Sequence, residues 1–221
     1  MAASSTHQAD DRTPRAAGEP AAPAGPGGSG PRVPPAFSEA VAALEAVEPR
    51  AEVRLSPLPP PRRLASYAHA LSASVRAGAE ELADGRFVLL HEPAGEESWQ
   101  GVFRVVTLAR SELEPELATD PLLPEVAWSW LTEALDAQGL DRRAMGGTVT
   151  RAGSDFFGGL ADRPARAELE LRASWTPAAA AGLGAHLLAW CELLAQCAGL
   201  PPETGGPAVT ALPRRRGPRP G

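Results

Sequence analysis

RFVLLHEPAGEESWQGVFRVVTLAR, residues 86–110, decides the fold class. It contains two runs of apolar and β-branched residues, 86–90 and 101–110, separated by the polar stretch HEPAGEESWQ. Two such runs around a polar connection predict an antiparallel hairpin with a long loop. A hairpin needs no helical crossover, so these residues favour an antiparallel sheet over a doubly wound parallel one.

A second stretch, ARAELELRASW (165–175), alternates strictly between apolar and polar residues. The apolar set is Ala167, Leu169, Leu171, Ala173 and Trp175, and the polar set is Glu168, Glu170, Arg172 and Ser174. Clean alternation predicts a strand with one buried and one solvated face. Further strands are predicted at 52–56 and 146–159. Residues 63–76 fit helical and strand periodicity equally well, and we interpret them as a strand.

Three helices are predicted, over 38–48, between Pro124 and Gly139, and over 178–200. Ser38 can cap the first helix, and Thr176 with Pro177 can begin the last one. The sequence therefore predicts an α+β domain. It would hold an antiparallel sheet of about four to six strands, as judged from the strand patterns, with three helices packed mainly on one face.

The two ends of the chain differ in composition from its middle. Residues 1–36 hold seven prolines and the run GPGGSGPRVPP, and residues 201–221 hold six prolines and an arginine cluster. Such segments have few apolar groups to bury. We expect a disordered leader (1–36), a single domain (37–200) and a disordered tail (201–221).

Charge is unevenly distributed along the chain. The net charge is -6; the last 21 residues carry +3 and residues 1–36 are neutral, which leaves -9 for residues 37–200. Phosphate contacts dominate nucleic-acid affinity, so an acidic body argues against a nucleic-acid partner. Only the basic tail, with Arg214, Arg215 and Arg216, carries the charge for such contacts.

The sequence favours a cytoplasmic protein without a membrane span. The N-terminus lacks the apolar core of a signal peptide, and Glu192 interrupts the apolar segment 178–200. We expect that segment to be a buried helix. Cys191 and Cys197 are too few for a disulfide framework or a zinc site, so we expect reduced, buried thiols. We expect neither a metal nor a cofactor.

Several runs resemble one known family. They are GRFVLLHEP, ELATDPLLPEVAWSWLTEAL, GGTVTR, FFGGLAD, RASWTP and HLLAWCELLAQCAGLPP. They resemble an actinobacterial family catalogued as a domain of unknown function, number 3000, over roughly residues 36–216. The absence of Lys, Asn and Ile from the chain agrees with a GC-rich source. The resemblance implies no activity, cofactor or catalytic residue.

No motif in the chain specifies an enzyme. The paired glycines at 146–147 and 158–159 match no nucleotide-binding pattern. His91, Glu92, Glu96 and Glu97 lie in the predicted hairpin loop, which we interpret as a solvated turn. Ser154 and Asp155, with His69, His91 or His186, supply the residue types of a hydrolase triad, but their setting is not a nucleophile elbow. His186 is better interpreted as a hydrogen-bonded core histidine.

Five residues are candidates for binding. Arg104 interrupts the apolar strand VFRVV and needs a partner. The structural interpretation is an ion pair with Glu168 or Glu170. The functional interpretation is an anion site on an open sheet face, formed with Arg151 and Arg172. Trp99 and Trp128 have no predicted core role, so they are either exposed binding residues or partly buried packing residues.

The leading hypothesis is a non-catalytic intracellular interaction or regulatory protein. It would bind an unknown protein partner through an open, charged sheet face and an exposed tryptophan. The alternative is a small-ligand-binding protein or an enzyme, with a pocket around Arg104 and the 91–99 loop. A flat face with exposed apolar groups would favour the first hypothesis, and a deep cavity with convergent polar groups would favour the second.

Overall fold

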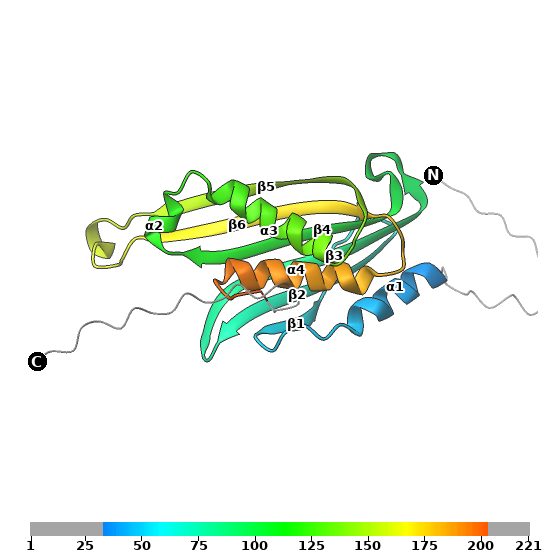
Figure 1. Cartoon of the computed structure of the whole chain (residues 1–221), viewed down its shortest axis with the longest axis horizontal. Coiled ribbons are helices and arrows are strands. Elements are labelled where there is room, and N and C mark those ends of the chain that lie inside the picture. Colours follow the sequence, from blue (N-terminus) through cyan, green and yellow to red (C-terminus); the bar gives the residue numbers. More distant parts are fainter. Residues whose placement is uncertain (1–32, 203–221) are drawn as a thin grey trace, which may run out of the picture. The chain divides into compact units, whose positions relative to one another are not determined.

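A computed structural model describes residues 33–202 of the chain, and it confirms the α+β class (Figure 1). The strands are β1 (Val53–Leu58), β2 (Tyr67–Ala77), β3 (Glu80–Glu96), β4 (Gly101–Leu113), β5 (Arg142–Ser154) and β6 (Arg166–Pro177). The longer helices are α1 (Pro35–Glu45), α3 (Leu123–Ala137) and α4 (Leu183–Cys197). Short helical turns are α2 (Pro115–Ala118), η1 (Glu97–Trp99) and η2 (Gly158–Leu160).

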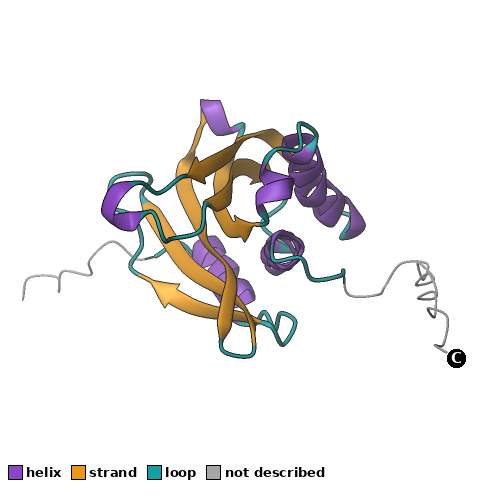
Figure 2. Ribbon diagram, turned by 90° about the vertical axis from the view of Figure 1, so that its left-hand side faces the viewer, coloured by secondary structure: helices purple, strands orange, loops and turns teal. Residues whose placement is uncertain are grey.

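All six strands form one antiparallel sheet in the order β1-β2-β3-β4-β6-β5. The helix α4 packs against β2, β3, β4 and β6, and both α1 and α3 pack against α4. Figure 2 shows the strands curving around this helix. The three longer helices therefore cover one face, as the sequence predicts. We call the opposite face of the sheet the open face.

The alternation along β4 shows how each face is built. Phe103, Val105 and Ala109 are buried on the helix side, whereas Val106 and Arg110 are exposed on the open face. The residues of β6 alternate in the same register, with Leu169, Leu171, Ala173 and Trp175 buried. The predicted assignment of buried and solvated faces for residues 165–175 is therefore correct.

A close approach between helix and sheet fixes the position of α4. Trp190 is fully buried, and its ring lies 5.7 Å from that of Phe87. A Cβ at Gly85 would lie 2.6 Å from Cζ2 of Trp190, so the indole occupies space that only glycine leaves free. The segment 178–200 thus contains a buried helix, although the helix begins only at Leu183. None of the helices within residues 33–202 combines the length and apolar character that a membrane crossing demands.

The long hairpin loop expected at 91–100 is mostly strand. β3 continues to Glu96, and pairing resumes between Glu96 and Gly101 after a register shift. His91 is buried because its ring stacks on Phe103 at a centroid distance of 4.3 Å, and its Nδ1 lies 3.0 Å from the carbonyl oxygen of Val102. The interpretation of His91 as part of a solvated turn is therefore wrong.

The predicted start of the last helix is also wrong. Thr176 and Pro177 end β6, and α4 begins after Gly182, whose φ is +91°. Thr176 stays in the strand because it is buried and its hydroxyl donates to the carbonyl oxygen of Trp99 at 2.6 Å.

The other predicted boundaries differ by a few residues. α1 begins at Pro35, two residues before the expected domain boundary, and Ser38 lies inside the helix rather than at its cap. The ambiguous segment 63–76 is a strand from Tyr67 onward. The remaining predictions for the leader and the tail concern residues 1–32 and 203–221, outside the described part of the chain.

Candidate functional site

An apolar row crosses the open face, perpendicular to the strands. Strand register places Leu58, Ala70, Val88 and Val106 side by side on β1 to β4, and the row continues as Ser174 and Gly146 on β6 and β5. Val106 lies at its centre and is 36% exposed. We call these six positions the apolar row. Of its four apolar members, Val106 is exposed, Leu58 and Val88 are half-buried, and Ala70 is buried. An exposed apolar side chain in the middle of a sheet face is a candidate contact point, since such faces are normally polar.

The neighbouring row is basic. Register places Arg86, Leu108 and Arg172 side by side on β3, β4 and β6. Adjacent strands lie about 4.8 Å apart, so the two arginine backbones are roughly 10 Å from each other across Leu108. Arg86 is exposed, and its guanidinium forms no hydrogen bond or ion pair with another residue in the 33–202 range. Its charge is therefore available to a ligand or partner.

A groove of about 520 Å³ lies over these two rows. We call it the amphipathic groove. Its lining includes three apolar side chains of the middle strands, three arginines and the small or hydroxylated residues of β5 and β6. These apolar and arginine side chains are Val88, Val106, Leu108, Arg86, Arg110 and Arg172.

One carboxylate partly balances the arginines of the amphipathic groove. Glu170 accepts hydrogen bonds from Nε of Arg110 at 2.8 Å and from Nε of Arg172 at 2.7 Å. The bond from Arg110, followed by that from Arg172, holds the pKa of Glu170 below its ordinary value. The same bond to Glu170 raises the pKa of Arg110. The groove therefore has a local excess of positive charge, because Glu170 is one carboxylate beside the three arginines Arg86, Arg110 and Arg172.

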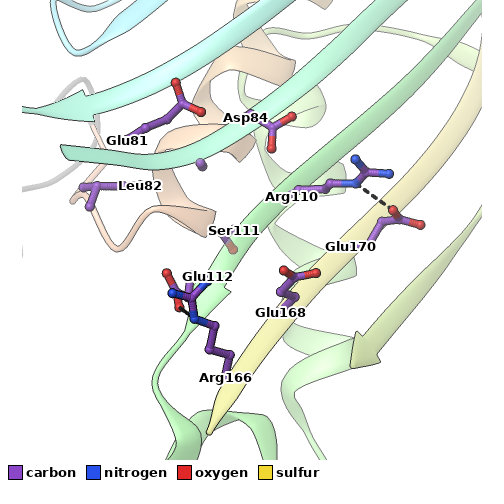
Figure 3. Close-up of a pocket in the computed structure, with 10 residues that line it drawn as sticks. Glu81, Leu82, Asp84, Arg110, Ser111, Glu112, Arg166, Glu168 and Glu170 are labelled. Carbon is purple, nitrogen blue, oxygen red and sulfur yellow. Dashed lines mark hydrogen bonds and ion pairs between the residues drawn. The ribbon is translucent and has the colours of Figure 1, made fainter. Parts of the chain in front are cut away.

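Beyond Arg110 the open face becomes acidic (Figure 3). A second groove, also about 520 Å³, is lined by Glu81, Asp84, Glu112 and Glu168, together with Arg166. Arg166 lies 3.9 Å from the carboxylate of Glu112. We call this the acidic groove. Arg110 lines both grooves, so the open face changes from basic and apolar to acidic along the strand direction.

The ion pair predicted between Arg104 and Glu168 or Glu170 is not formed, because Arg104 has other partners. Its Nη1 donates to the carbonyl oxygen of Ala144 at 2.8 Å and to Oγ1 of Thr176 at 3.2 Å. Its Nη2 donates to Oγ of Ser174 at 2.7 Å. The register explains the difference, because Glu170 lies opposite Arg110, three open-face positions away from Arg104.

The bonds of Arg104 hold an irregular part of the edge strand. β5 changes register between Arg143 and Gly146, and Ala144 there has a φ of +45°. A non-glycine residue in this conformation needs support from its surroundings. Partial burial lowers the pKa of Arg104, but a guanidinium remains charged at neutral pH. Arg104 therefore joins β4, β6 and the bulge of β5.

The other predicted anion-site residue, Arg151, lies on the helix side. It is paired in register with the buried Leu169, and its Nη1 donates to the carbonyl oxygens of Ala118 and Asp120 at 3.2 and 2.6 Å. Of the predicted set Arg104, Arg151 and Arg172, only Arg172 lines the amphipathic groove. The predicted cluster is therefore not formed.

Neither candidate tryptophan is fully exposed. Trp99 is half-buried, and its carbonyl accepts the bond from Thr176. Trp128 is half-buried on the helix side, where a Cβ at Gly147 would lie 2.6 Å from its Cζ3. Trp128 packs against the core and so follows the packing interpretation, whereas the binding role proposed for Trp99 stays a prediction. Val106 is the exposed apolar group in the middle of the open face, and Val102 is exposed near the end of the same strand.

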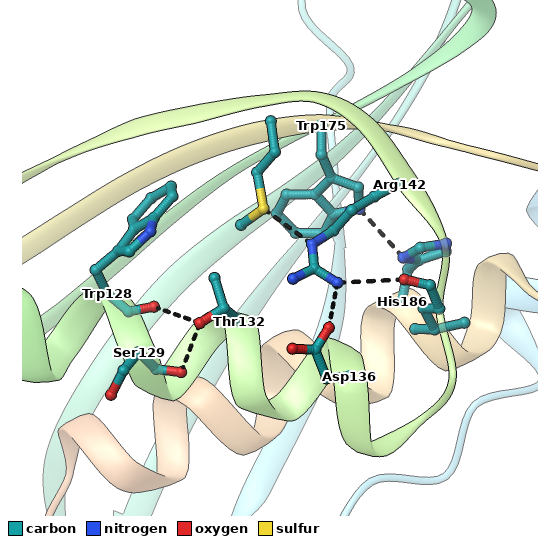
Figure 4. Close-up of polar contacts among 9 residues, drawn as sticks. Trp128, Ser129, Thr132, Asp136, Arg142, Trp175 and His186 are labelled. Carbon is teal, nitrogen blue, oxygen red and sulfur yellow. Dashed lines mark hydrogen bonds and ion pairs between the residues drawn. The ribbon is translucent and has the colours of Figure 1, made fainter.

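A polar cluster on the helix side joins α3, β5, β6 and α4 (Figure 4). Nη1 of Arg142 donates to Asp136 at 2.7 Å, and Nε1 of Trp175 donates to Nδ1 of His186 at 3.1 Å. Burial, reinforced by the charge of Arg142, lowers the pKa of His186 to about 4. His186 is therefore a neutral, hydrogen-bonded core histidine, as the sequence predicts.

The residue types that could form a metal site or a hydrolase triad lie as follows. Within residues 33–202, no group of three or more His, Cys, Asp or Glu side chains is placed to hold a metal ion. Ser154 and Asp155 are exposed at the end of β5. His91 and His186 are buried, with the contacts given above.

Apart from Arg172, the residues that make the amphipathic groove were not predicted from the sequence. Arg86, Val88, Val106 and Leu108 all occupy strands that it predicted. The available signal was the alternation itself, which places Arg86 and Val88 on the face opposite the buried Phe87 and Leu89. The pairing of Arg86 with Leu108 and Arg172 depends on register, which the local pattern does not specify.

Comparison with known proteins gives a family and no closer relative. No curated protein and no solved structure matches the chain. One family model, described as "Protein of unknown function (DUF3000)", matches residues 33–208. This range includes all six strands and the three longer helices, and it covers well over half of the chain. The chain therefore belongs to the DUF3000 family of proteins of unknown function.

Proposed function

We propose that this is a non-catalytic interaction protein, which binds a partner protein through the open face. The observation that carries the proposal is Val106, exposed at the centre of an apolar row that crosses the sheet. Protein interfaces combine an apolar centre with a charged rim. The amphipathic groove has this arrangement, and Arg86, whose side chain has no partner within residues 33–202, lines it.

The geometry gives less support to a pocket around Arg104 and the 91–99 loop. Three donors of Arg104 are occupied by Ala144, Ser174 and Thr176. Thr176 in turn binds the carbonyl of Trp99. These contacts use the polar groups to join the loop to the sheet. An enzyme or a small-ligand site would instead need polar groups that are directed at a substrate.

We also propose that the protein works in the cytoplasm of an actinobacterium. Its two cysteines are free and buried, which suits a reducing compartment. The family resemblance and the codon-biased composition support the source. A regulatory role would follow from binding alone, without chemistry on the partner.

The test compares two valines of similar exposure. Val106 is 36% exposed on the open face, and Val126 is 41% exposed on α3. The full chain and its Val106→Asp and Val126→Asp variants would be purified from the native host, and the associated proteins quantified by mass spectrometry. Circular dichroism would show that both variants fold. We expect Val106→Asp to lose the associated protein and Val126→Asp to keep it. Equal recovery with both variants would contradict the proposal.

A further inference from the structure

We infer that the segment bound by the amphipathic groove is both apolar and acidic, with aspartate or glutamate side chains interleaved among aliphatic ones. This inference rests on the proposed function and adds the chemistry of the partner. It follows from the floor of the groove, the charges at its rim and the charge of the surrounding face.

The floor of the groove requires aliphatic side chains from the partner. Val88, Val106 and Leu108 lie next to each other on β3 and β4, and Val106 is the most exposed of them. Covering these side chains removes apolar surface from water, which favours association. A fully polar segment would instead desolvate its own groups against apolar side chains, which is unfavourable.

The rim of the groove requires negative charge. The guanidinium of Arg86 has no partner among the described residues, and Arg172 shares the carboxylate of Glu170 with Arg110. Carboxylates bind guanidinium groups through paired hydrogen bonds. A segment with carboxylates next to its apolar residues therefore matches the arginines that line the groove.

The acidic groove limits the length and the kind of anion. A long polyanion centred on Arg86 and Arg172 would extend over Asp84, Glu112 and Glu168, where like charges repel it. This disfavours nucleic acid and an anionic membrane surface. A short acidic segment avoids the repulsion, and a lysine or arginine at its end would suit the acidic groove.

The experiment uses defined peptides and the full-length chain. The probe is a fluorescein-labelled peptide that alternates leucine and glutamate and ends in two lysines. The control peptide has glutamine in place of each glutamate. Fluorescence anisotropy at low salt measures both affinities. We expect the glutamate peptide to bind at least tenfold more tightly than the glutamine peptide, the scale of one charged hydrogen bond.

Variants locate the binding. Arg86→Gln combined with Arg172→Gln should weaken binding of the glutamate peptide at least tenfold, a loss of two charge-assisted contacts. Arg62→Gln combined with Arg63→Gln removes the same charge from exposed positions between β1 and β2, and it should change the affinity less than twofold. Vesicles containing phosphatidylglycerol and a single-stranded oligonucleotide serve as competing probes.

The outcomes separate this inference from the proposed function. Equal binding of the two peptides, no binding of either, insensitivity to the arginine variants, or tighter binding of vesicles or oligonucleotide would each overturn the inference. The proposed function would still hold if Val106→Asp alone abolished partner recovery. If Val106→Asp had no effect on that recovery, the proposed function itself would fail.

Discussion

Nη2 of Arg104 donates a hydrogen bond to Oγ of Ser174 at 2.7 Å, from one strand to its neighbour across the open face. Arg104 is half-buried, and its guanidinium donates hydrogen bonds to the hydroxyls of Ser174 and Thr176 and to the carbonyl oxygen of Ala144, without a carboxylate partner. A cation satisfied in this way avoids the full desolvation of a buried ion pair. It also secures the bulge of β5, at one end of the apolar row.

Replacing Arg104 with alanine should destabilise the fold by about 1–3 kcal/mol, because it leaves polar groups of Ala144, Ser174 and Thr176 without their donor. Urea denaturation measures this free energy of unfolding. Combining Arg104→Ala with Ser174→Ala should cost less than the sum of the single changes, whereas Arg104→Ala and Glu170→Ala should be additive. Coupling to Glu170 rather than to Ser174 would refute the contacts described.

Gly147→Ala should destabilise the protein and Gly146→Ala should not. A Cβ at residue 147 would lie 2.6 Å from Cζ3 of Trp128 and in contact with the backbone of β6, whereas a Cβ at residue 146 meets nothing within 4 Å. Overpacking of this kind costs about 1–3 kcal/mol. Thermal unfolding of the two neighbouring variants compares them directly. Equal melting temperatures would mean that Trp128 of α3 does not pack closely against β5 at Gly147.

Stability should fall as the pH drops from 6.5 to 4, in part through His186. Its pKa is about 4 in the folded protein against an ordinary 6.5, so in this window the unfolded chain binds a proton that the folded chain does not. Above pH 6.5 this effect vanishes. Burial also lowers the pKa of His69, which adds to the same trend.

A variant isolates the contribution of His186 from that of His69. His186→Gln keeps an acceptor for the indole of Trp175 and removes the titration, so its unfolding free energy should depend less on pH. Between pH 6.5 and pH 4 the wild-type protein should lose stability on the order of 3 kcal/mol more than the variant does. Parallel pH profiles for the two proteins would show that His186 is not buried as described.

Cys191 and Cys197 should resist thiol reagents until the protein unfolds. Both are buried, and burial raises the pKa of each thiol to about 12. The thiolate is the reactive form, so native labelling at pH 8 should be slow and labelling in denaturant fast. Ser154→Cys places a thiol at an exposed position and should react at once. Rapid native labelling of the wild-type chain would be inconsistent with this core.

Local patterns predict this fold well where one period dominates. The alternation of residues 165–175 assigns Leu169, Leu171 and Trp175 to the buried face because side-chain direction in a strand depends on position alone. The start of α4 was misplaced because Thr-Pro is a good helix start by itself. The bond from Thr176 to Trp99, 77 residues away in sequence, favours the strand instead.

The site is harder to predict than the fold, because it depends on pairing between strands. Arg86 and Arg172 are neighbours only through the registers of β3 with β4 and of β4 with β6. Connection lengths and bulges set those registers, and no local pattern encodes them. The same uncertainty produced the wrong partner for Arg104, since Glu170 lies on the correct face but opposite Arg110.

The most direct test of the open face is site-specific photo-crosslinking in the living host. A photoreactive phenylalanine analogue would replace Val106, on the apolar row, or Val126, the comparably exposed residue on α3. We predict one discrete crosslinked protein from position 106. It should be absent from position 126 and lost when Arg86→Gln and Arg172→Gln are added. Crosslinking from position 126 alone, or from neither position, would contradict the claim that the open face binds a partner.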